Sequence, residues 1–162
     1  MQETTVVMED NELVREADGG SGGRGTESIR QVLDFCSGNE AASLAAKDIR
    51  FHVMGYFPIT PSTEVAENLS RMQANGEHDI VMIPGDGEHG AAGICYGAAL
   101  GGGRVLNATS SQGLLYSLEQ LPVQAGTRVP MVLNIAARSV SGPLDIRCDH
   151  SDIYYAIFGD TG

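Results

Sequence analysis

A single carboxylate stands in a glycine-rich turn directly after an apolar run. Residues 79–84 (DIVMIP) are mostly apolar, and residues 85–93 (GDGEHGAAG) place Glu88 among small residues. An apolar run bounded by Gly and Pro predicts a buried parallel strand, and the small residues after it predict the start of a closely packed helix. Glu88 is therefore expected at the carboxyl end of a strand, where open α/β sheets bind ligands.

Polar residues also follow three other predicted strands. Thr60 follows the first, Thr109, Ser110 and Ser111 follow the third, and Arg138 follows the fourth. Because the carboxyl ends of parallel strands share one edge of a sheet, these loops are expected to converge on one site. Arg138, like Glu88, is a charge flanked by small apolar residues, and such charges are usually paired or directed at a ligand.

The elements that position these residues alternate between helix and strand. The patterns predict strands over 50–57, 79–84, 104–109 and 130–137, and helices over 37–49, 63–76, 89–103, 112–126 and from 151 onward. Pro122 offers an early end to the helix over 112–126. The alternation predicts an α/β fold, a doubly wound and mostly parallel sheet with helices on both faces. No strand follows the last helix, so we expect the domain to be incomplete at its C-terminus.

Composition divides the chain into an arm and a domain. Residues 1–36 are acidic and Gly-rich, and 17–28 (ADGGSGGRGTES) are typical of a flexible linker, with a short helix conceivable over 28–36. Residues 37–162 are expected to form the folded domain.

Charge and cysteine usage exclude several classes of function. The chain has 21 Asp plus Glu against 10 Lys plus Arg, which argues against binding to nucleic acid or to an anionic membrane. It has no apolar stretch long enough to span a bilayer and no signal-peptide pattern at its start. The three cysteines, Cys36, Cys95 and Cys148, are odd in number and far apart, which makes a disulfide framework unlikely and favours the cytoplasm. They form no C-x-x-C pair, which argues against an iron–sulfur cluster on this chain.

The glycine spacing leaves one alternative open. Gly85, Gly87 and Gly90 fit G-x-G-x-x-G after a strand and before a helix, which is typical of a dinucleotide-binding module. Two observations argue against dinucleotide binding. The negative charges of Asp86 and Glu88 would face the negative charge of a pyrophosphate. No acidic residue stands about 20 residues further on to bind a ribose hydroxyl. A non-catalytic dinucleotide-binding module remains the alternative function.

Other polar residues near the turn are weighed separately. A GDG motif followed by an asparagine holds Mg²⁺ in some enzymes, but Asn107 lies within a predicted strand, so no metal is assigned to Asp86. His89 is expected either to contact a cofactor or to serve the helix start. Cys95 is expected in the core, and Asp149 is expected to cap the last helix.

Three ordered segments carry a resemblance to a known family. They are GYFPITPSTEVAE, GDGEHGAAGICYGAALGGGRVLNATSSQGLLYSLEQL and PMVLNIAARSVSGPLDIRCDHSDIYYA. Together they resemble the 2-oxoacid:ferredoxin oxidoreductases, the pyruvate:ferredoxin/flavodoxin oxidoreductase group. The resemblance is to the alpha subunit or first domain, which binds the pyrimidine half of thiamine diphosphate, and it spans about 38–156.

The resemblance implies roles for individual residues. Glu88 matches the glutamate that hydrogen-bonds the pyrimidine ring of the cofactor. Thr60 and Arg138 match the residues that contact the carboxylate of the substrate. The turn that contains Thr109, Ser110 and Ser111 matches a loop that lines the cofactor pocket.

The resemblance also implies a reaction and partners. Such an enzyme decarboxylates a 2-oxoacid oxidatively, forms acyl-CoA and CO₂, and passes electrons to ferredoxin or flavodoxin. Thiamine diphosphate is shared with a partner subunit or domain, and Mg²⁺ and the iron–sulfur clusters are expected on that partner. We therefore expect this chain to act in a cytoplasmic hetero-oligomer and to be inactive alone.

Overall fold

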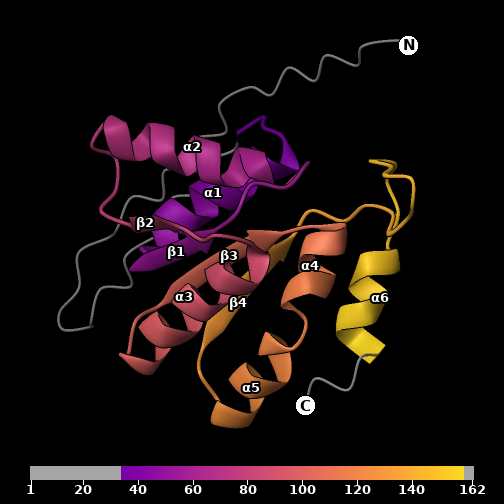
Figure 1. The fold of residues 1–162 in the computed structure, drawn as a ribbon. Coiled ribbons are helices and arrows are strands. Elements are labelled where there is room, and N and C mark those ends of the chain that lie inside the picture. Colours follow the sequence, from indigo (N-terminus) through magenta and orange to yellow (C-terminus); the bar gives the residue numbers. More distant parts are fainter. Residues whose placement is uncertain (1–33, 159–162) are drawn as a thin grey trace, which may run out of the picture. The chain divides into compact units, whose positions relative to one another are not determined.

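A computed structural model describes residues 34–158 of the chain (Figure 1). The N-terminal arm predicted over 1–36 lies almost entirely outside the described residues, and residues 34–36 have no regular structure. The short helix considered over 28–36 likewise falls mostly outside them, and the predicted domain boundary stays a prediction. The unit that begins at Phe35 is compact and contains every helix and strand described below.

The described residues form one four-stranded sheet. Its strands are β1 (Val53–Tyr56), β2 (Val81–Pro84), β3 (Val105–Thr109) and β4 (Met131–Ile135), in the order β2-β1-β3-β4. All three neighbouring pairs are parallel, so the predicted doubly wound sheet is confirmed. The chain runs from β1 out to β2 and then returns past β1 to β3. The direction of winding therefore changes between β1 and β3, which is where folds of this kind bind ligands.

Helices cover both faces of this sheet. The helices of the described part are α1 (Gly38–Ile49), α2 (Thr63–Ala74), α3 (Glu88–Leu100), α4 (Ser111–Ser117), α5 (Gln120–Thr127) and α6 (Ser151–Phe158). Figure 1 shows α1 and α2 together on one side of the strands and α3, α4 and α5 on the other. Helix α6 packs against α4. None of the helices in the described range is long and apolar enough to cross a bilayer.

Helix α1 begins and ends as its sequence predicts. The Ser37 hydroxyl accepts a hydrogen bond from the backbone N of Glu40, and the Glu40 carboxylate accepts one from the backbone N of Ser37. This capping box satisfies two N–H groups that have no partner inside the helix. Arg50 then takes a left-handed conformation (φ 56°) that ends the helix.

The predicted helix over 112–126 is two helices. Helix α4 ends at Ser117 and α5 begins at Gln120, so the break lies before Pro122. The expectation that Pro122 ends a helix is wrong, because Pro122 is the third residue of α5. The N–H groups of a first turn have no partner within the helix, so a residue that lacks this group is tolerated there.

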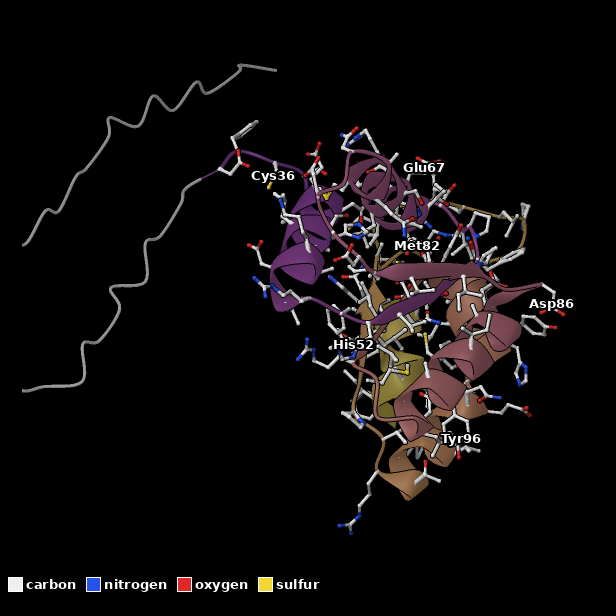
Figure 2. The ribbon with its side chains drawn as sticks, turned by 90° about the vertical axis from the view of Figure 1, so that its left-hand side faces the viewer. Cys36, His52, Glu67, Met82, Asp86 and Tyr96 are labelled. Atoms are coloured by element: carbon white, nitrogen blue, oxygen red, sulfur yellow. The ribbon has the colours of Figure 1, made fainter. Side chains whose placement is uncertain are left out.

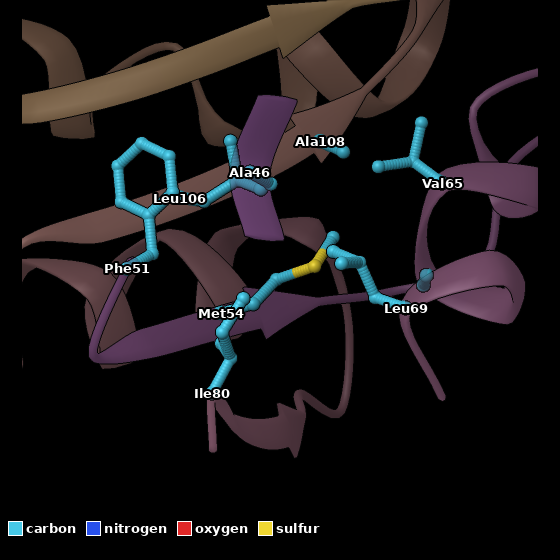
Figure 3. Close-up of a cluster of buried hydrophobic side chains, with 9 residues drawn as sticks. Ala46, Phe51, Met54, Val65, Leu69, Ile80, Leu106 and Ala108 are labelled. Carbon is cyan, nitrogen blue, oxygen red and sulfur yellow. The ribbon is translucent and has the colours of Figure 1, made fainter. Parts of the chain in front are cut away.

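The main core lies between the sheet and the α1–α2 pair. Met54, Leu106 and Ala108 of the central strands meet Val65 and Leu69 of α2 there, and all five are buried. Figure 3 shows the side chains of Met54 and Leu69 pointing toward one another within this cluster. Alternate residues of β1 and β3 face the opposite side, as strand geometry requires.

On the other face, helix α3 approaches the sheet closely. A Cβ atom on Gly55 of β1 would overlap the backbone O of Ala91 and would lie 2.9 Å from the Cys95 Sγ. Cys95 is fully buried, accepts a hydrogen bond from Gly55 N (3.3 Å) and donates one to Leu106 O (3.2 Å). Its predicted place in the core is confirmed, and burial raises the pKa of its thiol.

Strand β2 is an edge strand in the described structure, and the expectation of a fully buried strand is wrong. The side of β2 away from β1 has no strand partner in the described sheet, and Val81 is 52 % exposed. An apolar run indicates that a segment is hydrophobic. It does not indicate whether the strand lies at the centre or at the edge of the sheet, because that depends on which strands pair with it.

The close approach of α3 to β1 predicts opposite effects at two glycines. Gly55→Ala should destabilise the domain by about 2 kcal/mol, because the new methyl group has no room against the α3 backbone. Gly97→Ala, at an exposed position of the same helix with no neighbouring atom within 4 Å, should stabilise it by about 0.5–1 kcal/mol. Urea unfolding of both variants measures the difference, and equal effects would contradict the packing described here.

Candidate active site

The loops that follow the four strands lie at one edge of the sheet. Thr60 lies between β1 and α2, Glu88 is the first residue of α3 after β2, Thr109 ends β3, and Arg138 follows β4. Because all four strands are parallel, these positions share the carboxyl edge, as predicted.

The side chain of Glu88 lies against the start of α4. It is half-buried, and a Cβ atom on Gly113 would lie 2.6 Å from Glu88 Oε1 and 2.7 Å from Thr109 Oγ1. Only a residue without a side chain leaves this room. Within residues 34–158, no hydrogen bond or ion pair reaches the Glu88 carboxylate. Its place at the first residue of α3 is favourable for a negative charge, because helix N-termini carry partial positive charge.

Thr109 adds a second polar group without a partner. Its side chain is 1 % exposed, and no described residue hydrogen-bonds its Oγ1. Buried hydroxyl groups nearly always have a partner, so an unpaired one calls for an explanation. The Thr109 hydroxyl and the Glu88 carboxylate both lie next to Gly113, and this arrangement provides an explanation. Together the hydroxyl and the carboxylate offer a hydrogen-bond donor and an acceptor to a polar ligand.

The two serines that follow Thr109 are used differently. Ser110 Oγ donates to Ala136 O (2.7 Å), and Ser111 Oγ donates to Ser139 O (2.6 Å). Both residues are fully buried. Their hydroxyl groups therefore join the turn to the loop after β4, and of the three predicted pocket residues only Thr109 keeps an unpaired hydroxyl.

Arg138 is a buried cation that lacks an anionic partner in the described part. Its side chain is 5 % exposed, Nη1 donates to Asp145 O (2.9 Å), and Nε has no hydrogen-bond partner. No carboxylate of residues 34–158 forms an ion pair with it. Because burying an unpaired charge is costly, this guanidinium is well suited to an anion that comes from outside the described residues.

The structure does not join Thr60 to these groups. Thr60 is exposed in the loop before α2, and no hydrogen bond within residues 34–158 links it to Glu88 or Arg138. Thr60, Glu88 and Arg138 share the carboxyl edge of the sheet, and the described contacts bring Glu88 and Thr109 together around Gly113.

His89 is paired within the chain. Its Nε2 lies 2.7 Å from Glu119 Oε1 and 2.9 Å from Gln120 Nε2, and its ring lies 6.1 Å from that of Tyr116. These contacts tie the start of α3 to the start of α5. They border a hollow of about 430 Å³ lined by His89, Leu115, Tyr116 and Glu119, which does not include Glu88. Of the two roles expected for His89, the contacts favour the one at the helix start.

Asp86 and Asn107 do not come together. Figure 2 shows Asp86 at the tip of the loop that follows β2, where it is exposed. Asn107 lies within β3 as predicted, and its Nδ2 contacts Cys95 Sγ at 3.9 Å. The pair does not form the metal-binding arrangement considered from the GDG motif.

Two of the three glycines of the G-x-G-x-x-G spacing are explained by packing. A Cβ atom on Gly85 would lie 2.6 Å from the backbone N of Ala91, and one on Gly87 would lie 3.0 Å from Tyr116 Cε1. Both glycines therefore let the turn close against its own helix and against α4.

Two acidic residues near the start of α6 have different roles. Asp149 Oδ1 accepts a hydrogen bond from Ser151 N (2.6 Å), which confirms its predicted capping role, and the hydrogen bonds from Ser151 lower the pKa of this carboxyl. Asp152 was not predicted. It is fully buried and accepts hydrogen bonds from the backbone N of both Ser111 and Arg138. Its position directly after Ser151, at the start of the last predicted helix, was its only signal.

Comparison with known proteins identifies the family. Residues 44–162, about three quarters of the chain, match the family described as "Pyruvate flavodoxin/ferredoxin oxidoreductase, thiamine diP-bdg". The chain belongs to this family. The resemblance seen in the sequence is thereby confirmed, and the match supports it over the dinucleotide-binding alternative.

Relatives of the pyruvate flavodoxin/ferredoxin oxidoreductase family share this region. The chain is 44 % identical over 124 residues to pyruvate synthase subunit PorA of Pyrococcus furiosus, and 42 % identical over 124 residues to ketoisovalerate oxidoreductase subunit VorA of Pyrococcus horikoshii. In each case 76 % of this chain aligns with 31 % of the relative. The chain thus spans about a third of the length of these relatives.

A solved structure agrees with the fold. The 2-oxoglutarate:ferredoxin oxidoreductase from Magnetococcus marinus, solved with 2-oxoglutarate, coenzyme A and succinyl-CoA bound, superposes with a TM-score of 0.66 at 27 % identity. The superposition covers 78 % of this chain and 22 % of that chain.

The contact between Gly113 and Glu88 predicts a measurable coupling. Gly113→Ala should destabilise the domain by about 2 kcal/mol, because the new methyl group overlaps the Glu88 carboxylate and the Thr109 hydroxyl. In a Glu88→Ala background the same change should cost clearly less, since one of the two overlaps is gone. Denaturant unfolding of the single and double variants measures the coupling.

Gly126→Ala in α5 is the matched control, because a Cβ atom there meets nothing within 4 Å. Additive effects of Gly113→Ala and Glu88→Ala would contradict the placement of the carboxylate.

Proposed function

We propose that this chain supplies the cofactor-activating and substrate-binding part of a 2-oxoacid:ferredoxin or flavodoxin oxidoreductase. The observation that carries the proposal is the Glu88 carboxylate, which packs against Gly113 beside the unpaired Thr109 hydroxyl and has no partner in the described part. Such an acceptor and donor pair at the carboxyl edge fits a polar heterocycle. Membership of a family described as thiamine-diphosphate-binding supports the aminopyrimidine of that cofactor as the heterocycle.

Glu88 and Thr109 would hold the pyrimidine half of thiamine diphosphate. When bound, thiamine diphosphate supplies a nucleophilic carbon and an electron sink for the decarboxylation of 2-oxoacids. Glu88 would share a proton with a ring nitrogen of the pyrimidine and so orient the ring and set its tautomer. The Thr109 hydroxyl would donate or accept a hydrogen bond at the edge of the same ring, while Ser110 and Ser111 shape the turn that lines the pocket.

Arg138 and Thr60 would bind the carboxylate of the 2-oxoacid. A guanidinium presents a planar fork that forms two parallel, charge-assisted hydrogen bonds with a carboxylate. The unpaired Nε of Arg138 and the lack of an anionic partner within residues 34–158 support this role. Thr60 would add a hydroxyl donor without a further charge, and its exposure at the same edge leaves it accessible to a substrate.

The remaining parts of the enzyme would come from further polypeptide. The relatives are subunits by name, and this chain corresponds to about a third of their length. We propose a partner subunit or domain that binds the diphosphate with Mg²⁺ and carries the iron–sulfur clusters, coenzyme A as the acyl acceptor, and ferredoxin or flavodoxin as the electron acceptor. The complex would act in the cytoplasm, and this chain alone would be inactive.

The role of Glu88 predicts a large loss of activity in a variant of the same size. In the complex with its partners, Glu88→Gln should lower 2-oxoacid-dependent dye reduction by about a hundredfold or more, the scale of a lost proton-transfer group. Glu88→Asp should keep part of the activity. Asp86→Asn, which removes an exposed carboxylate from the same loop, is the control and should keep the full rate. An unchanged rate in Glu88→Gln would exclude the proposed role.

The role of Arg138 predicts weaker substrate binding. Arg138→Lys keeps the charge but loses the planar fork, so the KM for the 2-oxoacid should rise by about tenfold or more. Arg147→Lys, in the same loop, changes an exposed arginine that pairs with Asp145 and should leave KM unchanged. Steady-state kinetics of both variants, with unfolding curves to match their stability, make the comparison. Equal KM values for the two variants would count against substrate binding by Arg138.

A further inference from the structure

A completely buried carboxylate connects the two loops of the candidate site. Asp152, the second residue of α6, is 0 % exposed. Its Oδ2 accepts hydrogen bonds from Ser111 N (2.9 Å) and Arg138 N (3.1 Å), and its Oδ1 accepts one from Ile153 N (2.8 Å). Three backbone donors thus satisfy a group that would otherwise be costly to bury.

Two of these donors belong to the loops that carry the site. Ser111 begins α4 and lies two residues after Thr109, whose hydroxyl adjoins the Glu88 carboxylate. Arg138 itself carries the buried guanidinium. Asp152 Oδ2 therefore joins the backbone of Ser111, in the turn proposed to line the cofactor pocket, to the backbone of Arg138, which is proposed to bind the substrate.

The backbone conformation of Ser111 depends on this connection. Ser111 has a φ of 44°, in the left-handed region that residues other than glycine seldom adopt. Such a conformation persists only where surrounding contacts determine it. The contacts here are the bond from Ser111 N to Asp152 and the bond from Ser111 Oγ to Ser139 O, both made with the segment that follows β4.

We propose that Asp152 is a positioning residue that orients the 109–113 turn and Arg138 together. It acts by accepting hydrogen bonds from the backbone amides of Ser111 and Arg138, and it does not touch the cofactor or the substrate. A carboxylate suits the task because both of its oxygens accept hydrogen bonds, whereas the NH₂ group of an asparagine would face an N–H donor. The proposal rests on the function proposed for Thr109, Glu88 and Arg138.

The test compares Asp152→Asn and Asp152→Ala with Asp149→Ala in the full complex. Asp149 accepts a hydrogen bond from Ser151 N at the entry to the same helix but, in the described structure, forms no hydrogen bond with the 109–113 turn or with Arg138, so its variant reports on the helix start. We expect Asp152→Asn to raise the Kd for thiamine diphosphate and the KM for the 2-oxoacid together, each by about tenfold, the scale of one lost hydrogen bond to a charged group. Asp152→Ala should exceed this, and Asp149→Ala should change neither constant.

Amide hydrogen exchange separates this proposal from the proposed function. Asp152→Ala should speed exchange at both Ser111 and Arg138, whereas Asp149→Ala should leave both protected. If both amides lose protection while Kd and KM match those of Asp149→Ala, Asp152 is structural only and the proposal is overturned. It is also overturned if neither amide changes. If the wild-type complex itself binds no thiamine diphosphate, the proposed function fails, and the exchange data alone decide whether Asp152 couples the two loops.

Discussion

The parallel pairing of β1 with β3 is the constraint on which the candidate site depends. It joins the part of the chain that winds outward to β2 with the part that returns to β3 and β4, and it directs every strand to the same edge. On one face of β1, helix α3 lies almost against the strand backbone, and Gly55 leaves the room for it. The close contact sets the start of α3, and with it the place of Glu88.

Polar groups at this edge fall into two kinds. Ser110, Ser111 and Asp152 are buried with their hydrogen bonds satisfied inside the chain, and together they bind the turn after β3 to the segment after β4. Thr109 Oγ1 and Arg138 Nε are buried without partners in the described part, and the Glu88 carboxylate is half-buried and also unpaired. Buried polar groups without a partner are uncommon in folded proteins, so the ones that lie at this edge are candidates for contact with a ligand.

Much of the fold followed from local patterns in the chain. The capping box at Ser37 and the positive φ of Gly76 after α2 mark helix ends through local backbone chemistry, so a local argument finds them. Pro122 misled because proline is compatible with the first turn of a helix as well as with its end, and the break at residues 118–119 carries no such local signal. The burial of β2 was overestimated because hydrophobicity does not report which strands pair.

Apart from the break between α4 and α5, the sequence by itself determined the order of helices and strands. It also determined the alternation that requires a parallel sheet and the candidate residues Glu88, Thr109 and Arg138 at strand ends. These follow from periodicity and from residue chemistry, which are properties of neighbours along the chain. The tertiary structure alone decided that Gly113 makes room for the Glu88 carboxylate, that the two serines are used internally, and that Asp152 joins two loops. Those facts depend on residues 14 to 41 positions apart meeting in space, and no local pattern encodes such a meeting.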